Sequence, residues 1–188
     1  MAGITDKNPS NPNFLHPNKF IFSFARAPNL QYFCQSATVP GLSIGEAMFN
    51  TPFVDLFSPG DKPMYDLLNV TFLIDEDLKS WLEIHDWLRA MSFPEGYADY
   101  KNMSKLNKFA GNQPKFPQFH DASLTLFSSS NNPKFRFKFK DAFPTTLSTF
   151  VINSADSPDE ILTADATFRF AYYDIEKLSK LVYPLMRR

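Results

Sequence analysis

The sequence is poor in cysteine, in glycine and in uninterrupted apolar stretches. Its 188 residues include a single cysteine, Cys34, and six glycines. A single cysteine excludes a framework of intrachain disulfides and fits a reducing compartment. No stretch approaches the roughly 20 apolar residues of a membrane-spanning helix, and the polar first residues lack the apolar core of a signal peptide. We therefore expect a protein made in cytosol-like conditions, without a membrane segment.

The chain also has no excess of one charge and no glycine-rich phosphate-binding loop. Its 19 Lys and Arg residues are balanced by 20 Asp and Glu residues, which gives a formal net charge of −1. Nucleic-acid-binding proteins neutralise phosphates with basic surfaces. The balance therefore argues against a strongly basic nucleic-acid-binding protein.

Side chains that could carry catalysis or bind a metal are scattered along the chain. Neighbouring helix residues point about 100° apart, so we expect His85 and Asp86 not to face each other. The acidic run 75–77 is explained by a helix start, where carboxylates cap free N–H groups. Cys34 has no histidine near it in the sequence and is interpreted as a buried, unreactive thiol. We expect no enzyme activity, no cofactor and no metal site.

Phenylalanine is abundant, with 21 copies, and much of it falls in runs that alternate apolar and polar residues. Such alternation predicts β-strands. The predicted strands cover residues 19–27, 31–39, 69–74, 122–129, 134–141 and 162–173, and a further candidate covers 147–154. Turn-forming residues separate several of these runs, at Pro28-Asn29, Pro40-Gly41 and 131–133.

One segment changes period and predicts a helix over about 76–92. Its apolar residues recur every three or four positions, which gives one apolar face. They are Leu78, Trp81, Leu82, Ile84, Trp87, Leu88 and Met91. Phe93-Pro94 is expected to end the helix. Residues 94–120 are polar and contain three prolines, which predicts a loop.

Residues 41–66 combine turn-forming residues with apolar side chains that need a place to be buried. We expect either an extended hairpin or a segment that packs on a neighbouring chain. The apolar residues from this segment that we assign to a subunit interface are Phe49, Phe53, Val54, Leu56 and Phe57.

The run 135–140 alternates phenylalanine with basic residues. Alternation in a strand places Arg136, Lys138 and Lys140 on the face opposite the phenylalanines. A platform for single-stranded nucleic acid needs aromatic and basic side chains on the same face. We therefore interpret the three basic residues as part of a solvated face or of a subunit interface.

Four segments together resemble the tail tube proteins of contractile-tailed bacteriophages. Residues 139–148 carry an aromatic-Pro-Thr corner, and residues 161–173 carry that family's Thr-Ala-x-Ala-Thr-Phe pattern with an aromatic end. Residues 33–41 resemble the family's aromatic-x-Cys segment before a long loop, and residues 72–76 its Asp-Glu step from strand to helix. The resemblance covers roughly 19–175.

The resemblance implies a mainly β fold: a small β-barrel or two packed antiparallel sheets, with one flanking helix at about 76–92. The tail-tube-like domain would span 19–175, between a flexible N-terminal arm, 1–18, and a C-terminal extension, 176–188. Six copies would form a ring, and rings would stack into the inner tail tube of a contractile phage tail. Sheath and baseplate proteins would be partners, and DNA would pass through the lumen without sequence-specific binding. Such a protein has no cofactor, is assembled in the host cytoplasm and ends in the virion.

Three alternatives stay open. A baseplate or tail-terminator ring protein on the same fold would suit the extra arm and the C-terminal extension. A tube component of a contractile injection system would share the same sequence features. A small enzyme or sugar-binding β-sandwich would instead use the Trp and Tyr residues for a ligand.

Overall fold

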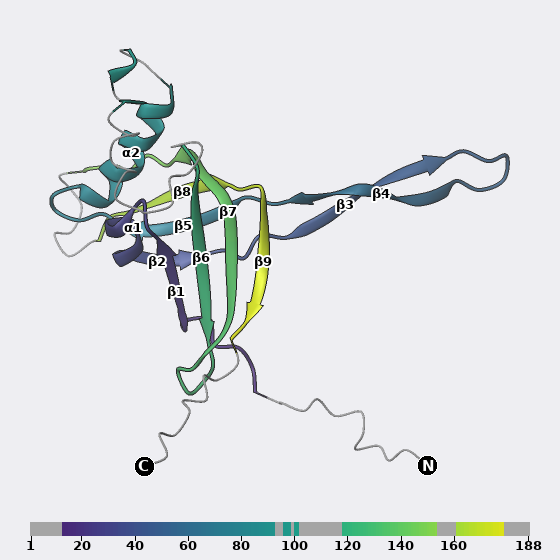
Figure 1. Cartoon of the computed structure of the whole chain (residues 1–188), viewed down its shortest axis with the longest axis horizontal. Coiled ribbons are helices and arrows are strands. Elements are labelled where there is room, and N and C mark those ends of the chain that lie inside the picture. The colour runs from purple at the N-terminus through teal and green to yellow at the C-terminus, as the bar shows by residue number, and fades with distance from the viewer. Residues whose placement is uncertain (1–12, 93–95, 99, 102–117, 154–160, 179–188) are drawn as a thin grey trace, which may run out of the picture.

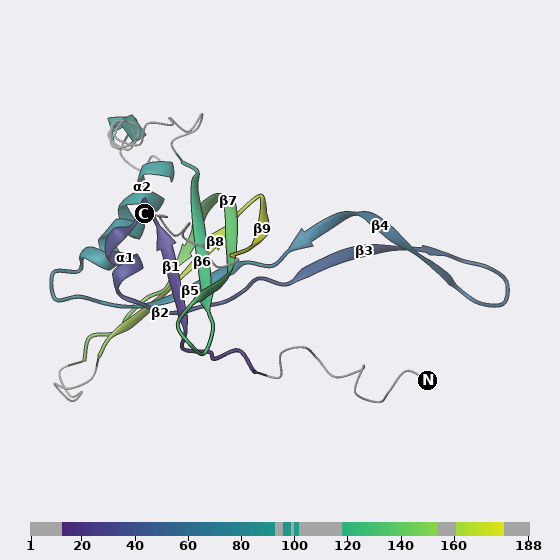
Figure 2. The same cartoon turned by 60° about the horizontal axis from the view of Figure 1, so that its bottom comes forward.

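The computed structural model describes residues 13–92, 96–98, 100–101, 118–153 and 161–178. They form a body of antiparallel strands with helix α2 (Lys79–Ser92) on one flank, and a two-stranded arm that extends away from the body (Figure 1, Figure 2). The predicted fold, mainly β with antiparallel sheets and a flanking helix, is confirmed. No helix in the described residues is long and apolar enough to cross a membrane.

Seven of the described strands form one antiparallel sheet that begins at β1 and ends at β2. The order is β1 (Phe20–Phe24), β6 (His120–Phe127), β7 (Pro133–Leu147), β8 (Thr163–Arg169), β5 (Leu68–Leu73) and β2 (Cys34–Ala37), and β9 (Tyr172–Lys177) pairs with β7.

Strand β7 belongs to both halves of this sheet. Residues 135–140 pair with β6 and β9, whereas residues 143–147 pair with β8. Between the two segments lies Asp141, whose φ of 54° is in the left-handed region and interrupts the strand geometry. The two halves pack face to face, since the rings of Phe24 on β1 and Phe168 on β8 lie 5.2 Å apart.

The core between the two halves is built largely from aromatic side chains. The largest of its buried residues are Trp87, Phe22, Phe24, Phe72, Phe139 and Phe168. Aromatic rings with centroids 4.5–7 Å apart stabilise one another in tilted or edge-to-face geometry, and Phe139 packs on Phe170 in this way at 5.1 Å. Phenylalanine thus supplies many of the large side chains of the core.

Helix α2 begins after the acidic run and places one face on the core, where Ile84 and Trp87 are buried. The Asp75 carboxylate accepts hydrogen bonds from the N–H groups of Lys79 at 3.1 Å and Ser80 at 2.8 Å. Desolvation acts to raise the pKa of Asp75, but its hydrogen bonds with Ser80 and Lys79 together outweigh this and lower the pKa. The cap confirms the predicted role of the acidic run.

The prediction of a strand over 31–39 is wrong for its first residues. Residues Pro28–Tyr32 form the short helix α1, and only Cys34–Ala37 form strand β2. Pro28 occupies the first turn of α1, where its fixed φ suits a helix and its missing N–H costs nothing. The Glu83 carboxylate of α2 accepts hydrogen bonds from the backbone N–H groups of Asn29 at 3.1 Å and Leu30 at 3.2 Å, which ties α1 to α2.

Three other predicted boundaries differ from the structure. The run 162–173 is split, because β8 ends at Arg169 and β9 starts at Tyr172 on the other half of the sheet. The candidate strand over 147–154 is absent from its described residues beyond Leu147, which ends β7. Strand β7 instead continues through the Phe-Pro-Thr-Thr corner, where the register shift between Pro144 and Thr146 accommodates the proline.

Several predicted features fall largely or wholly outside the described residues. They are most of the N-terminal arm, the helix stop at Phe93-Pro94, most of the loop over 94–120 and the chain after Leu178. In the described part of that loop, the N–H of Lys101 donates to the Tyr97 carbonyl at 3.1 Å.

Candidate subunit interface

The arm consists of β3 (Leu42–Phe49) and β4 (Leu56–Tyr65), which pair with each other in an antiparallel hairpin. It extends well beyond the body in both ribbon views (Figure 1, Figure 2). Of the two possibilities predicted for residues 41–66, the extended hairpin is therefore present. An isolated two-stranded hairpin is marginally stable in water at best, so this arm needs a surface to cover it.

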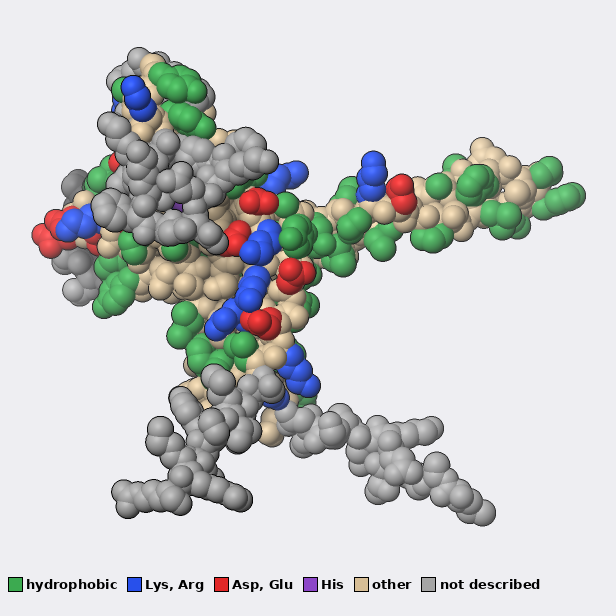
Figure 3. All heavy atoms as spheres, in the orientation of Figure 1, with side chains coloured by type: hydrophobic (Ala, Val, Ile, Leu, Met, Phe, Trp, Pro, Cys, Tyr) green, Lys and Arg blue, Asp and Glu red, His purple; other side chains and the backbone are tan. Residues whose placement is uncertain are grey.

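Most of the side chains on the arm are apolar and exposed. Pairing places Leu42 with Tyr65, Ile44 with Pro63 and Met48 with Phe57, and Phe49 with Leu56 on the opposite face. Phe53, at the tip, is 95% exposed. In Figure 3, hydrophobic side chains cover most of the visible face of the arm. Large exposed apolar surfaces of this kind are typical of interaction sites.

The base of the arm is fixed to the body. The N–H of Asp66 donates to the Gly41 carbonyl at 3.1 Å, which closes the hairpin. The Tyr65 ring packs against Phe170 and Tyr173, with centroids 5.7 and 5.3 Å apart. The direction of the arm is therefore set by the core, although its outer part contacts only itself among the described residues.

A bulge interrupts the arm between Ile44 and Glu46. The backbones of Gly45 and Gly60 approach closely there, so that a Cβ on Gly60 would lie 2.7 Å from the Gly45 carbonyl oxygen. A Cβ on Gly45 would meet nothing within 4 Å. Gly60 is thus required by the close approach of the two strands.

The basic residues of β7 form a second exposed feature, on the body beside β9. Arg136, Lys138 and Lys140 all lie on the outer face, as the alternation predicts, and Phe139 between them is buried. Figure 3 shows Lys and Arg side chains in a row on the body, with Asp and Glu side chains beside them.

This basic row has acidic partners within the chain. Glu176 on β9 lies 3.1 Å from Lys138 and 3.8 Å from Arg136, measured from Oε2 to Nζ and Nη1. Asp121 accepts a hydrogen bond of 2.5 Å from Lys140 Nζ, which raises the pKa of Lys140. Two carboxylates of the same chain thus offset part of the charge of the three basic residues, and exposed pairs of this kind contribute little stability.

Clusters of side chains that could bind a metal were predicted to be absent. The described residues contain no group of three His, Cys, Asp or Glu side chains that could hold a metal ion. The expectation that His85 and Asp86 do not face each other is wrong, because their side chains meet at 3.2 Å on the surface of α2. The imidazole is stacked on Trp81 at 4.9 Å, and its side chain and that of Asp86 stay exposed to solvent, as in a surface pair.

Cys34 lies at the start of β2 and is partly buried. Burial raises the pKa of its thiol to about 11, because desolvation disfavours the thiolate. The thiolate is the nucleophilic form, so this environment fits the predicted unreactive thiol.

A comparison with protein families identifies the fold. The model of the phage tail tube protein family matches residues 10–176. The chain belongs to this family. The resemblance seen in the sequence is thereby confirmed.

Similar proteins place this tail tube family member among several kinds of tail component. It is 24% identical over 186 residues to the tail tube terminator protein of Enterobacteria phage T4, with 90% of this chain and 93% of that protein covered. Two solved structures share the fold, the baseplate and the tube-terminating cap of the anti-feeding prophage. Their TM-scores are 0.60 and 0.58, their identities 13 and 15%, and the match covers 89 and 95% of this chain and 97 and 100% of theirs.

Sequence reasoning found only part of the exposed apolar surface on the arm. It singled out five residues between Phe49 and Phe57 and left out Leu42, Ile44, Met48 and Met64, which are also more than half exposed. The alternation of Leu42, Ile44 and Met48 around Gly45 would have indicated a strand. Whether the arm and the basic row contact a neighbouring subunit stays a prediction.

Proposed function

We propose that this protein is a tail tube terminator, a ring protein that closes the end of the inner tube of a contractile phage tail. The observation that carries the proposal is the similarity to the T4 tail tube terminator, which extends over nearly the whole of both chains. The match to the tube-terminating cap of the anti-feeding prophage, complete for that chain, supports it at the level of fold. The main tube protein, which the sequence first suggested, becomes the alternative.

The physical features of the chain suit a subunit that closes a ring. The apolar arm would contact the neighbouring copy, through Phe49, Phe53, Val54, Leu56 and Phe57. Heterologous contacts of this kind close into a ring when the rotation between copies closes, and about six copies would form it. The near-neutral charge and the paired basic row would let DNA pass without binding tightly. The protein would act as a structural part of the virion, beside sheath proteins, and without catalysis.

Segments outside the tail-tube-like domain, 19–175, would distinguish a terminator from a tube subunit. We assign the N-terminal arm, 1–18, and the C-terminal extension, 176–188, to contacts with the parts that meet the tube end. A ring in the baseplate is a second candidate, supported by the fold of the anti-feeding prophage baseplate. Assembly would take place in the host cytoplasm.

Assembly of the purified protein tests the proposal. We expect sedimentation velocity and negative-stain microscopy to show single rings that do not stack into long tubes. Added to growing tubes of the cognate tube protein, the rings should stop elongation at substoichiometric amounts. Long tubes made of this chain alone would instead identify a main tube protein. A monomer at all concentrations, with or without tubes present, would contradict both assignments.

A further inference from the structure

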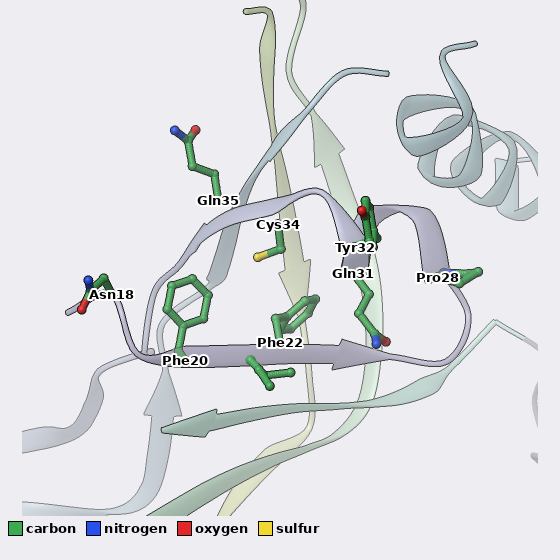
Figure 4. A pocket seen from close by; sticks show the side chains of 9 residues that line it. Asn18, Phe20, Phe22, Pro28, Gln31, Tyr32, Cys34 and Gln35 are labelled. Atoms are coloured by element: carbon green, nitrogen blue, oxygen red, sulfur yellow. The ribbon is translucent and has the colours of Figure 1, made fainter. Parts of the chain in front are cut away.

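The two ends of the main sheet face each other across a seam, which we define as the space between β1 and β2. Each of these strands pairs along one side only in the described residues, β1 with β6 and β2 with β5. A pocket of about 590 Å³ lies between them. Figure 4 shows β1 and β2 on opposite sides of this pocket, with the side chains of Phe20 and Cys34 projecting into the gap.

The seam is apolar inside and polar at its rim. Phe22 is buried at the floor, and Phe20 and Cys34 are partly exposed to the pocket. Asn18 and Gln35 lie at the rim and are exposed, and none of the lining residues is charged. A surface without charged side chains favours an uncharged partner.

One backbone edge of β1 is directed into the seam. The N–H of Phe127 on β6 donates to the Lys19 carbonyl at 3.0 Å, so Lys19 and every second residue after it face β6. The backbone groups of Phe20 and Phe22 therefore point away from β6. At the end of this edge, the Phe24 N–H donates to the Gln31 side chain at 3.0 Å. An edge of this kind is a template for an added strand or for polar backbone contacts.

We propose that the arm of one copy covers the β1–β2 seam of the next copy in the ring. This inference rests on the proposed ring assembly and names the surface that receives the arm. The tip of the arm, residues 49–57, matches the seam in chemistry, because Asp55 is its one charged residue. The match in charge favours a second copy of this chain over a charged partner such as DNA.

The area of the arm is sufficient for a specific contact. Phe49, Phe53 and Phe57 are 58, 95 and 62% exposed. A buried aromatic side chain removes roughly 150–250 Å² from water, so these three residues alone supply several hundred Å². A stable interface needs about 800 Å² per partner, and the remaining apolar residues of the arm can supply the rest.

The direction of the arm excludes a contact with the seam of its own chain. The arm and α1, which borders the seam, lie on opposite sides of the body in both ribbon views (Figure 1, Figure 2). The arm therefore points away from the seam of its own chain. At about 3.3 Å per residue, a strand of this length spans roughly 26 Å, enough to cross most of a neighbouring body. A donor on one side and an acceptor on the other give a head-to-tail ring.

Disulfide trapping tests the proposal in the full-length protein. In a Cys34→Ser background, Asn50→Cys at the exposed tip of the arm is combined with Asn18→Cys at the seam rim, and the assembled protein is oxidised with copper phenanthroline. We expect a ladder of cross-linked species up to the size of the ring on a non-reducing gel. The matched control combines Asn50→Cys with Ile175→Cys on β9, which is also exposed, and should give no ladder.

The outcomes separate the two proposals. Rings in the microscope without a ladder from the Asn18→Cys protein would overturn the seam as the receiving surface and leave the ring assembly standing. A Cys34→Ser parent that forms no rings, when the unmodified protein also forms none, would overturn both. As a second readout, we expect Phe53→Asp, which puts a charge on the tip of the arm, to stay monomeric, and alkylation of Cys34 should be at least tenfold slower in rings of the native protein than in this variant. An unchanged rate would contradict coverage of the seam.

Discussion

At the scale of single residues, burial and hydrogen bonding decide which polar groups stay inert and which hold the fold. Cys34 could be recognised from the sequence as a thiol without a histidine nearby, and its environment in β2 raises its pKa to about 11. Asp75 could be recognised as a helix cap from its position before the apolar period. The contact between His85 and Asp86 could not be predicted, because it depends on side-chain torsions rather than on the helical spacing of Cα atoms.

The raised pKa of Cys34 predicts slow alkylation. At pH 8 the reaction of the native protein with iodoacetamide should be about 100-fold slower than that of the urea-unfolded chain, whose thiol titrates near 8.5. The rate should rise steadily up to about pH 11. Because the folded pKa lies above the unfolded one, stability should fall as the pH rises from about 9 to 11. Equal rates in the native and unfolded chain would contradict this account.

Loss of the Asp75 cap should destabilise the body. Asp75→Ala removes the acceptor for the N–H groups of Lys79 and Ser80 and should lower the free energy of unfolding by about 1 kcal/mol. Asp77→Ala is the matched control, because Asp77 contacts only the exposed side chain of Lys79 and should change little. Urea titrations measure the free energy of unfolding of both variants.

The cap also has a pH signature. The pKa of Asp75 is lowered in the folded protein, so its stabilising effect is present above the unfolded pKa, near 3.9. The effect is lost as the pH falls through the lower folded value. The difference in stability between the native protein and Asp75→Ala should therefore shrink at acidic pH. A difference that grows on acidification would contradict the assigned hydrogen bonds.

At the scale of elements, the spacing of apolar residues predicts a strand or helix correctly where that element packs on one continuous surface. Strands β5 and β6 and helix α2 have such a surface, and the sequence predicts them within a few residues. Strand β7 is different, because its first half pairs with β9 and its second half with β8. The sequence pattern changes at Asp141 and Pro144 and therefore predicts two separate segments.

The helix α1 and the split between β8 and β9 depend on long-range partners. The backbone of α1 is held by Glu83, more than 50 residues away, and no local pattern reports this contact. Likewise, residues 172–177 continue the alternation of β8, but they pair with the other half of the sheet. The arm could be predicted as a hairpin from its composition, although its register required the structure.

The arm provides a prediction at the element scale. Gly60→Ala places a Cβ against the Gly45 carbonyl and should distort the bulge, whereas Gly45→Ala meets no neighbour within 4 Å. We expect Gly60→Ala to lose ring formation by sedimentation velocity and to keep the melting temperature of the body within a few degrees. Gly45→Ala should keep both ring formation and the melting temperature of the body. Normal rings from Gly60→Ala would show that the shape of the arm does not determine assembly.

At the scale of the whole molecule, the chain has a stable body and an apolar surface that the body does not cover. The fully buried core residues all lie outside the arm, so the body has a core of its own. The arm and the seam lie on opposite sides of the body, which suits a contact repeated around a ring. On the outer sheet face, carboxylates of β6 and β9 offset part of the positive charge of β7.

The central claim is that the protein forms one terminating ring per tail and does not form the tube itself. Quantitative mass spectrometry of purified virions, with a sheath or tube protein as the internal reference, measures this most directly. The account predicts about six copies per tail, as in a single closed ring. A copy number that equals that of the main tube protein, one per tube subunit along the whole tail, would contradict it.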